Sequence, residues 1–285
     1  MNALSRRRRQ LLLTAIALGV APAASASRDS AGADELITRV VAARQTIGYR
    51  VRAQLVRTTA GSEQRDVKQL LIKGRRRGDD SKALYQVLWP APVAGQTVVI
   101  EKTAGQDARA WMFTPPDHVA SLNPHGSGEA FFGSDLTIED LAEEFWHWPT
   151  QEIVGEDSFA QRRCKILVSR PPAGAPTSYA LVRTWVAPDI ALPLFIEEFG
   201  KDGALIKHIT AERITQRRDD SWTAARVVIE PADRRTRTVL EGSRADRDIE
   251  IPDADFTVER IKASLPAAPP ATEPTGAGSA GAGRP

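Results

Sequence analysis

The sequence has almost no cysteine, since Cys164 is the only one among its 285 residues. A single thiol excludes an intramolecular disulfide, so a hydrophobic core must hold the fold together. Cys164 alternates with Ile166 and Val168 in RRCKILVSR, which predicts a buried, unreactive thiol rather than a nucleophile. Because this cysteine also lies far from the start of the chain, we expect no lipid anchor on an N-terminal cysteine.

Sequence motifs that identify common enzyme classes are missing as well. The chain has no His-x-x-x-His or His-Glu-x-x-His pair, no Gly-x-Ser-x-Gly elbow and no Gly-rich phosphate loop. The alternative is an acid pair with nearby histidines, drawn from Asp135, Glu139, Asp140, His118, His125 and His147. Because these histidines are spread through a loop and a Trp-rich segment, we expect no catalytic residue, no metal site and no cofactor.

Neither aromatic content nor net charge indicates a partner. Aromatic residues make up 6% of the chain, so composition does not by itself reveal a cavity. The 38 basic and 36 acidic residues include four arginines, Arg6 to Arg9, within the first 26 residues, which contain no acid. Without that segment 34 basic residues face 36 acidic ones. This balance gives no electrostatic argument for nucleic-acid binding.

The first 26 residues have the three parts of a secretory signal peptide. The arginines are followed by an apolar run, Leu11–Val20, and by small residues that end at Ala26. The apolar run is short for a membrane span, although a membrane anchor is the alternative. We predict cleavage after Ala26 and a periplasmic protein, exported by the Sec route or, because Arg-Arg-Gln-Leu-Leu resembles a twin-arginine signal, by the Tat route.

The other end of the chain, SLPAAPPATEPTGAGSAGAGRP, is almost entirely Pro, Ala and Gly. Such a composition cannot bury enough apolar surface to become ordered. We therefore expect a signal peptide over residues 1–26, one folded domain over residues 27–262 and a disordered tail over residues 263–285.

The folded part begins with an amphipathic helix in DELITRVVAARQ. Leu36, Ile37, Val40 and Val41 lie on one stripe at helical spacing. We expect the helix to end at Gly48.

From YRVRAQLVR onward, apolar and polar residues alternate with a period of two, as in half-buried antiparallel strands. Further strand candidates follow at short intervals, joined by turns such as Lys201-Asp202-Gly203. The pattern predicts a mainly β fold: a strongly curved antiparallel sheet, or incomplete β-barrel, of about 11 strands. An N-terminal helix and a helical lid would cover it. The stretch TPPDHVASLNPHGSGEAFFGSD is expected to be a long loop within the meander.

The stretch FFGSDLTIEDL, residues 131–141, reads as a sharply defined helix start. Gly133 permits a positive φ at the turn. Thr137 is placed to cap the helix, with Asp140 three residues later completing a variant of the capping box. Leu136 and Leu141 occupy the two positions of a hydrophobic staple. These residues predict a structural corner in place of an acid–base pair.

This corner is similar to the Met-Gly-Ser-Asp-Phe-Ser-Tyr-Glu-Asp-Leu signature of the outer-membrane lipoprotein-sorting family, the LolA-like periplasmic carriers. TWVAPDIALPLFIEEFGKDGALIKHI resembles a strand pair of the family, and the segment from DSWTAARVVIE to DADFTVERI resembles its closing strands. The resemblance covers Asp34 to Ile261. The chain departs from the family ahead of the corner, where TPPDHVASLNPHGSGEA contains no Lys or Arg.

The resemblance implies a carrier for lipid. A buried methylene contributes about 0.8 kcal/mol, so an acyl chain costs roughly 12 kcal/mol to expose to water. A curved sheet under a lid offers an apolar face for such chains. We expect lipid contacts from Tyr49, Val51, Leu55, Trp111, Phe113, Phe131, Phe132 and Leu136. The same residues could instead be plain core, and Trp146 and Trp148 could be either core or a docking patch.

The implied cargo is an acylated lipoprotein or another lipid. The implied partners are an inner-membrane exporter and an outer-membrane acceptor, both met transiently, and we expect a monomer that binds no nucleic acid. The alternative is a periplasmic lipid-binding or sensing accessory of a membrane exporter or regulator.

Overall fold

The computed structural model describes residues 29–217 and 220–265. The predicted signal peptide and nearly all of the predicted tail therefore lie outside the described residues. The strands are β1 (Thr46–Thr59), β2 (Arg65–Arg77), β3 (Asp80–Trp89), β4 (Thr97–Lys102), β5 (Arg109–Thr114), β6 (His118–Leu122), β7 (Thr150–Phe159), β8 (Arg162–Arg170), β9 (Tyr179–Ala187), β10 (Leu192–Gly200), β11 (Leu205–Gln216), β12 (Trp222–Pro231) and β13 (Thr236–Arg247).

The helices are few and short. The α-helices are α1 (Ser30–Ala43), α2 (Ile138–Ala142) and α3 (Val258–Ala263). The 3-10 turns are η1 (Ala91–Val93), η2 (Phe131–Gly133), η3 (Glu144–His147) and η4 (Asp253–Phe256).

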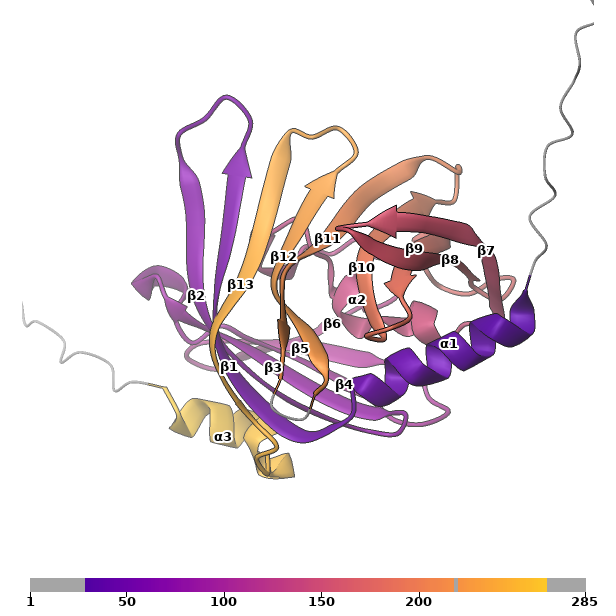
Figure 1. The fold of residues 1–285 in the computed structure, drawn as a ribbon. Helices are drawn as coiled ribbons and strands as arrows, with labels where there is room; N and C mark the ends of the chain where they lie inside the picture. Colours follow the sequence, from indigo (N-terminus) through magenta and orange to yellow (C-terminus); the bar gives the residue numbers. More distant parts are fainter. Residues whose placement is uncertain (1–28, 218–219, 266–285) are drawn as a thin grey trace, which may run out of the picture.

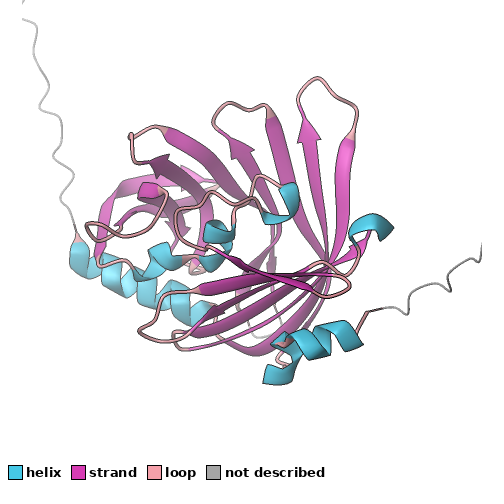
Figure 2. Cartoon of the chain, turned by 180° about the vertical axis from the view of Figure 1, so that it is seen from behind, coloured by secondary structure: helices cyan, strands magenta, loops and turns pink. Residues whose placement is uncertain are grey.

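All 13 strands belong to one antiparallel sheet, in the order β6-β5-β4-β3-β2-β1-β13-β12-β11-β10-β9-β8-β7. Each strand is hydrogen-bonded to the next strand in the chain, except that β6 and β7 do not pair with each other, and β13 returns to β1. Strands β6 and β7 form the two edges, so within the described residues the sheet does not close on itself. Figures 1 and 2 show the sheet curving around α2, with α3 outside the curve. A mainly β, strongly curved and open antiparallel sheet is confirmed.

The sheet has more strands than the 11 expected, partly because β6 lies inside the stretch predicted to be a loop. Strand β5 pairs with β6 from Thr114↔His118 to Ala110↔Leu122. The segment HVASL is short, its apolar and polar residues alternate only weakly, and prolines precede it. Such a sequence is typical of a loop. Pairing with β5 supplies the backbone hydrogen bonds that its own sequence does not specify.

Helix α1 begins at an Asp29 cap, whose carboxylate accepts a hydrogen bond from Gly32 N at 2.8 Å. It ends at Ala43, so the prediction that Gly48 ends it was wrong. Gly48 lies inside β1, where a Cβ atom would come within 2.3 Å of the Ile249 carbonyl oxygen. The glycine is required by this close approach of two backbones, which a local pattern cannot show.

Two faces of the sheet can be distinguished by the residues that they bury. The inner face contacts α2, and its register pairs Ile72 with Tyr85 and Tyr85 with Val98. The outer face buries Leu84 and Val99, the next residues along the same strands, beneath α3. Because side chains alternate along a strand, one residue of slippage would exchange the two faces. In the part of the chain that the structure describes, no helix has the length and apolar character to traverse a lipid bilayer.

Candidate functional site

The corner segment, residues 131–143, packs its apolar side chains onto the inner face. Phe131, Leu136 and Ile138 are at most 5% exposed and join the cluster that includes Leu70 and Val98. The rings of Tyr85 and Phe131 meet edge to face, with centroids 5.1 Å apart. The corner therefore covers the middle of the curved sheet.

The helix start within the corner has the predicted geometry. Asp140 N donates to Thr137 Oγ1 at 3.2 Å, and Thr137 N donates to Asp140 Oδ2 at 2.7 Å. This reciprocal pair is the capping box that the sequence predicted. Gly133 has a φ of 73°, as expected. Leu136 and Leu141, the staple residues, both contact the inner-face cluster.

Asp135, the first acid of the corner, is bound by the middle of the sheet. Its carboxylate accepts hydrogen bonds from Arg57 Nε at 3.2 Å and from the hydroxyls of Thr236 and Thr238 at 2.7 Å each. Its backbone N–H also donates to Thr238 at 3.0 Å. Asp135 thereby fastens the turn to β1 and β13.

Asp140 has a second role besides capping, because it lies over a buried lysine. The Asp140 carboxylate accepts hydrogen bonds from Lys207 Nζ and from the Tyr179 hydroxyl. Lys207 Nζ also lies 3.4 Å from Glu198 Oε2. The side chains of Lys207, Asp140 and Glu198 are 4%, 2% and 1% exposed. We call these four residues, Asp140, Tyr179, Glu198 and Lys207, the buried charge cluster.

The pKa values of this cluster reflect burial and mutual interaction. Burial, reinforced by the nearby Asp140 carboxylate, raises the pKa of Glu198 to about 8. Burial alone would lower the pKa of Lys207, but Asp140 and Glu198 outweigh it and raise this pKa above its ordinary value. Burial also raises the pKa of the Tyr179 hydroxyl. At neutral pH the cluster therefore holds a charged lysine and a largely protonated Glu198.

Glu139, a third acid of the corner, joins two loops. Its carboxylate accepts hydrogen bonds from Gly126 N at 3.2 Å, Ser178 N at 3.1 Å and the Thr177 hydroxyl. Asp135, Asp140 and Glu139 thus bind three separate sets of donors, and Glu143, the fourth acid of the corner, pairs with Arg44 and Arg76. Among the described residues, no group of three or more His, Cys, Asp or Glu side chains is arranged to hold a metal ion.

The structure divides the eight predicted lipid-contact residues between the two faces. Six belong to the inner-face cluster, of which Leu55, Phe131 and Leu136 are buried and the others half-buried: Tyr49, Val51, Leu55, Phe131, Phe132 and Leu136. Trp111 and Phe113 lie on the outer face, in the cluster beneath α3.

Placing Trp111 and Phe113 with the other six was therefore wrong. Along β5 it is Ala110 and Met112 that face inward, because Ile100 pairs with Ala110 and Val98 pairs with Met112. The two aromatic residues were predicted because they are large. The alternation of side chains along β5 determines instead which of them face α2.

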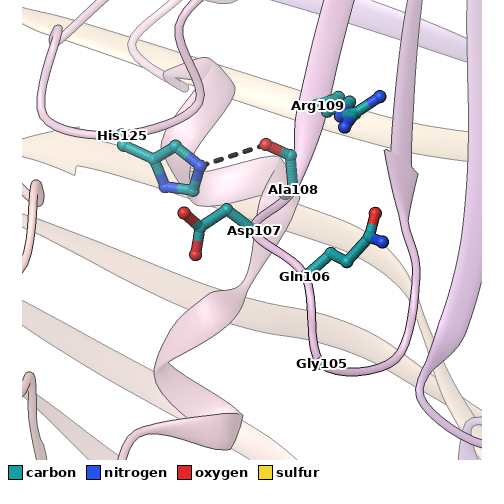
Figure 3. Close-up of a pocket in the computed structure, with 6 residues that line it drawn as sticks. All are labelled: Gly105, Gln106, Asp107, Ala108, Arg109 and His125. Atoms are coloured by element: carbon teal, nitrogen blue, oxygen red, sulfur yellow. Dashed lines mark hydrogen bonds between the residues drawn. The ribbon is translucent and has the colours of Figure 1, made fainter.

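The inner face beneath the corner is filled by the chain's own side chains, as the full burial of Phe131 shows. Two pockets lie elsewhere, near the loop that joins β4 to β5. One, of about 480 Å³, is lined by residues 105–109 and by His125, whose Nε2 lies 3.0 Å from the Ala108 carbonyl oxygen (Figure 3). The other, of about 630 Å³, extends to Lys102 and Tyr179.

The Trp-rich segment and the cysteine both belong to the core. Trp146 is 3% exposed, and Trp148 is half-buried in the same cluster as α1. Burial, followed by the nearby Lys102 charge, lowers the pKa of His147 between them. Cys164 is 2% exposed, and burial raises its thiol pKa, so the prediction of a buried thiol is confirmed.

Sequence reasoning missed Lys207 and Glu198. A usable signal was present, because both occupy inward positions in strands whose other inward residues are apolar, such as Ile196 and Ile209. A charged residue at such a position is expected to have a buried partner. Which partner it has depends on the tertiary fold.

Comparison with known proteins agrees with this architecture. A family model described as "Uncharacterized protein" matches residues 79–263. No curated protein matches the sequence.

Three solved structures resemble the chain over most of its length. An outer membrane lipoprotein-sorting protein domain from Vibrio parahaemolyticus has a TM-score of 0.74 at 18% identity, over 82% of this chain and 100% of that one. A DUF1329 family protein from Desulfovibrio piger has a TM-score of 0.73 at 21% identity, over 81% and 98%. A LolA superfamily protein from Nitrosomonas europaea has a TM-score of 0.62 at 15% identity, over 80% and 98%. The LolA-like fold that the sequence resemblance predicted is confirmed.

Proposed function

Because the chain belongs to the family matched over residues 79–263 and has the fold of LolA-like lipoprotein-sorting proteins, we propose that it is a non-catalytic periplasmic carrier of acylated cargo. The cargo is an acylated lipoprotein or another lipid, bound on the inner face. An inner-membrane exporter would supply it, and an outer-membrane acceptor would receive it. Residues 1–26 would direct export, and the carrier would work as a monomer.

One observation supports this proposal most directly: a broad apolar inner face is covered by a short segment that is not part of the sheet. The inner-face cluster draws buried residues from β1 to β6 and from β12, including Leu55, Leu70 and Ile229. The corner that covers it contains a single five-residue helix, α2. Such a cover can leave without breaking a strand pairing.

The energetics favour exchange of the corner's side chains for acyl chains. Lifting the corner would expose Phe131, Leu136 and Ile138, each worth about 1.5–3 kcal/mol of burial. One acyl chain, at roughly 12 kcal/mol, more than compensates for this loss. We therefore propose that the corner is the lid and that acyl chains occupy the place of these three side chains. Of the six inner-face residues predicted from the sequence, Tyr49, Val51 and Leu55 of β1 would line this place, and Phe131, Phe132 and Leu136 would move with the corner.

The proposal is tested by asking whether the corner must move for cargo to bind. The Asp135 backbone nitrogen lies 3.0 Å from the Thr238 side-chain oxygen. A protein with Asp135→Cys and Thr238→Cys, in a Cys164→Ala background, can therefore lock the corner when oxidised. We expect fluorescent acylated peptide to bind the reduced protein and to be excluded from the oxidised one. The parent protein, treated identically, controls for the oxidant.

Native mass spectrometry of protein isolated from the periplasm provides the second measurement, with co-purifying lipid as the expected result. Absence of bound lipid, together with no uptake of acylated peptide or fatty acid by the parent protein, would overturn the proposal. Transfer of bound lipid to acceptor vesicles separates a carrier from the accessory role, in which lipid is retained.

A further inference from the structure

We propose that the cargo has an anionic group at the end of its acyl chains, and that Lys207 binds this group in the place that Asp140 occupies in the structure. The group would be a fatty-acid carboxylate or a lipid phosphate. This inference depends on the proposed function, because it requires cargo on the inner face.

The position of Lys207 is the first step of the argument. It lies on β11, part of the sheet, and its side chain is 4% exposed. Its main partner, Asp140, lies in α2, part of the corner, 67 residues away in sequence. Asp140 is also bonded to the backbone of Thr137 at the start of the helix. When the corner leaves, Asp140 must leave with it, while Lys207 stays on the sheet.

The groups that remain around Lys207 after the corner leaves give the second step. Its other acid, Glu198, is on β10 at 3.4 Å, and the Glu198 Oε2 atom accepts no hydrogen bond from the described residues. Tyr179, on β9, loses Asp140 as its acceptor. The departure of the corner thus removes the nearest carboxylate of Lys207, the Asp135 carbonyl oxygen at 3.4 Å and the acceptor of the Tyr179 hydroxyl, and it leaves Glu198 as the one described acid beside the lysine.

The chemistry that fits this vacated place is the third step. A lysine covered by hydrocarbon is costly unless a charged partner returns. A neutral lipid would not supply one. The oxygens of a carboxylate or phosphate would accept from Lys207 Nζ and from the Tyr179 hydroxyl, as the Asp140 carboxylate does. The corner therefore acts as an internal substitute for the anionic end of the cargo.

Three arginines also bind the corner, and they fit this role less well. The side chains of Arg44 and Arg76, which pair with Glu143, are 26% and 21% exposed, and that of Arg57 is 37% exposed, so water can solvate them when the corner departs. Asp135 also has two threonine hydroxyls as partners. Only the lysine is both deeply buried and dependent on the corner for its main acceptor.

The test compares two probes that differ in one group, oleate and oleyl alcohol, by displacement of a fluorescent fatty acid at pH 8. We expect the parent protein to bind oleate about tenfold more tightly, as one charge-assisted hydrogen bond provides. This comparison needs no variant. Vesicles of phosphatidylglycerol and of phosphatidylcholine form the second pair of probes. A preference confined to oleate identifies a carboxylate, and one confined to phosphatidylglycerol identifies a phosphate.

Variants sharpen the assignment to Lys207. The double variant Lys207→Met/Glu198→Gln leaves fewer buried charges without partners and is expected to keep binding oleyl alcohol while losing the preference for oleate. Asp140→Asn, which weakens the internal competitor, is expected to bind oleate more tightly. Lys165→Met is the matched control, because Lys165 pairs with Glu156 at a site where it is 38% exposed. We expect it to retain the preference.

Equal affinity of the parent protein for oleate and oleyl alcohol, together with no preference between the vesicles, would overturn this inference and leave the proposed function standing. Failure to bind any of the four probes would instead count against the proposed function. An unchanged preference in the double variant would show that another cation binds the anion.

Discussion

The two faces of the sheet are covered in different ways. The corner on the inner face is attached through buried polar groups as well as apolar side chains: Asp140 binds Lys207, and Asp135 binds two threonines of β13. Helix α3 on the outer face and the turn η4 before it are attached through buried apolar side chains, Ile261 and Phe256. Of their ion pairs, that of Lys262 with Asp117 at 2.6 Å lies at the surface, and that of Asp255 with Lys73 at 2.8 Å is half-buried.

The two covers therefore differ in how far their attachment depends on a specific charged partner. Apolar contacts stabilise α3 in any aqueous medium, because they need no specific partner. Buried charges stabilise the corner only while each has its counter-charge, and a ligand that supplies a counter-charge can compete. A cover of the second kind suits a face that has to open, and a cover of the first kind suits a face that stays closed. Three measurements test this comparison.

The largest difference is expected between two lysines, Lys207, which binds the corner, and Lys262, which belongs to α3. Lys207→Met leaves Asp140 and Glu198 buried without a cation, so we expect a loss of about 3–5 kcal/mol in the free energy of unfolding. Lys262→Met removes a surface pair and should cost no more than about 1 kcal/mol. Urea denaturation of both proteins gives the two values. A loss below about 1 kcal/mol for Lys207→Met would contradict the importance of the buried charge cluster.

The pH dependence of stability should have opposite signs for the two covers. Because the pKa of Glu198 is raised from 4.5 to about 8, the folded protein holds a proton that the unfolded chain releases. This proton contributes its full amount to the free energy of unfolding below about pH 4.5. The contribution is lost as the pH rises to about 8, by at most about 1.4 kcal/mol per pH unit. Glu198→Gln should remove this slope, as measured by urea denaturation across that range.

At the outer cover, hydrogen bonds from Lys82 and Arg75 lower the pKa of Asp253. The ionised Asp253 carboxylate therefore contributes to the free energy of unfolding above the ordinary aspartate pKa, and this contribution is lost as the pH falls. Asp253→Asn should remove this smaller loss of stability at acidic pH. It should leave the pH dependence of the free energy of unfolding between pH 4.5 and 8 unchanged. Identical pH slopes in the parent protein and the Glu198→Gln protein would show that this carboxyl does not titrate as described.

The smallest expected effect compares the two threonine caps. Thr137 caps α2 within the capping box, and Thr257 caps α3 by accepting from Arg260 N at 3.3 Å. Either Thr→Ala change should destabilise the protein by about 1 kcal/mol. Only Thr137→Ala should also loosen the corner and speed uptake of fluorescent acylated peptide in stopped-flow experiments. Equal uptake rates for the two variants would argue that the corner is not the lid.

Local features of the fold were predictable because a few neighbouring residues determine them. The alternation in YRVRAQLVR specifies a strand wherever it is placed. The capping box of Thr137 and Asp140 involves atoms only three residues apart. For the same reason the resemblance in the corner pointed to the correct fold, although the short strand β6 was taken for a loop.

The candidate site was only partly predictable, because its key contacts join distant segments. The sequence shows that Trp111 and Ala110 face opposite ways, yet not which of them faces inward. That depends on the register of β5 with β4. Likewise, the sequence shows a lysine among apolar neighbours in ALIKHI but cannot show that Asp140 lies over it.

By itself, then, the sequence determined most of the strands, the capping box and the class of fold that they build, since these depend on short-range hydrogen bonding and side-chain periodicity. Only the tertiary structure decided which side chains the corner covers and which charges it neutralises. The physical reason is that burial and ion pairing depend on distances in space, and the curved sheet brings Lys207 to Asp140 across 67 residues of chain.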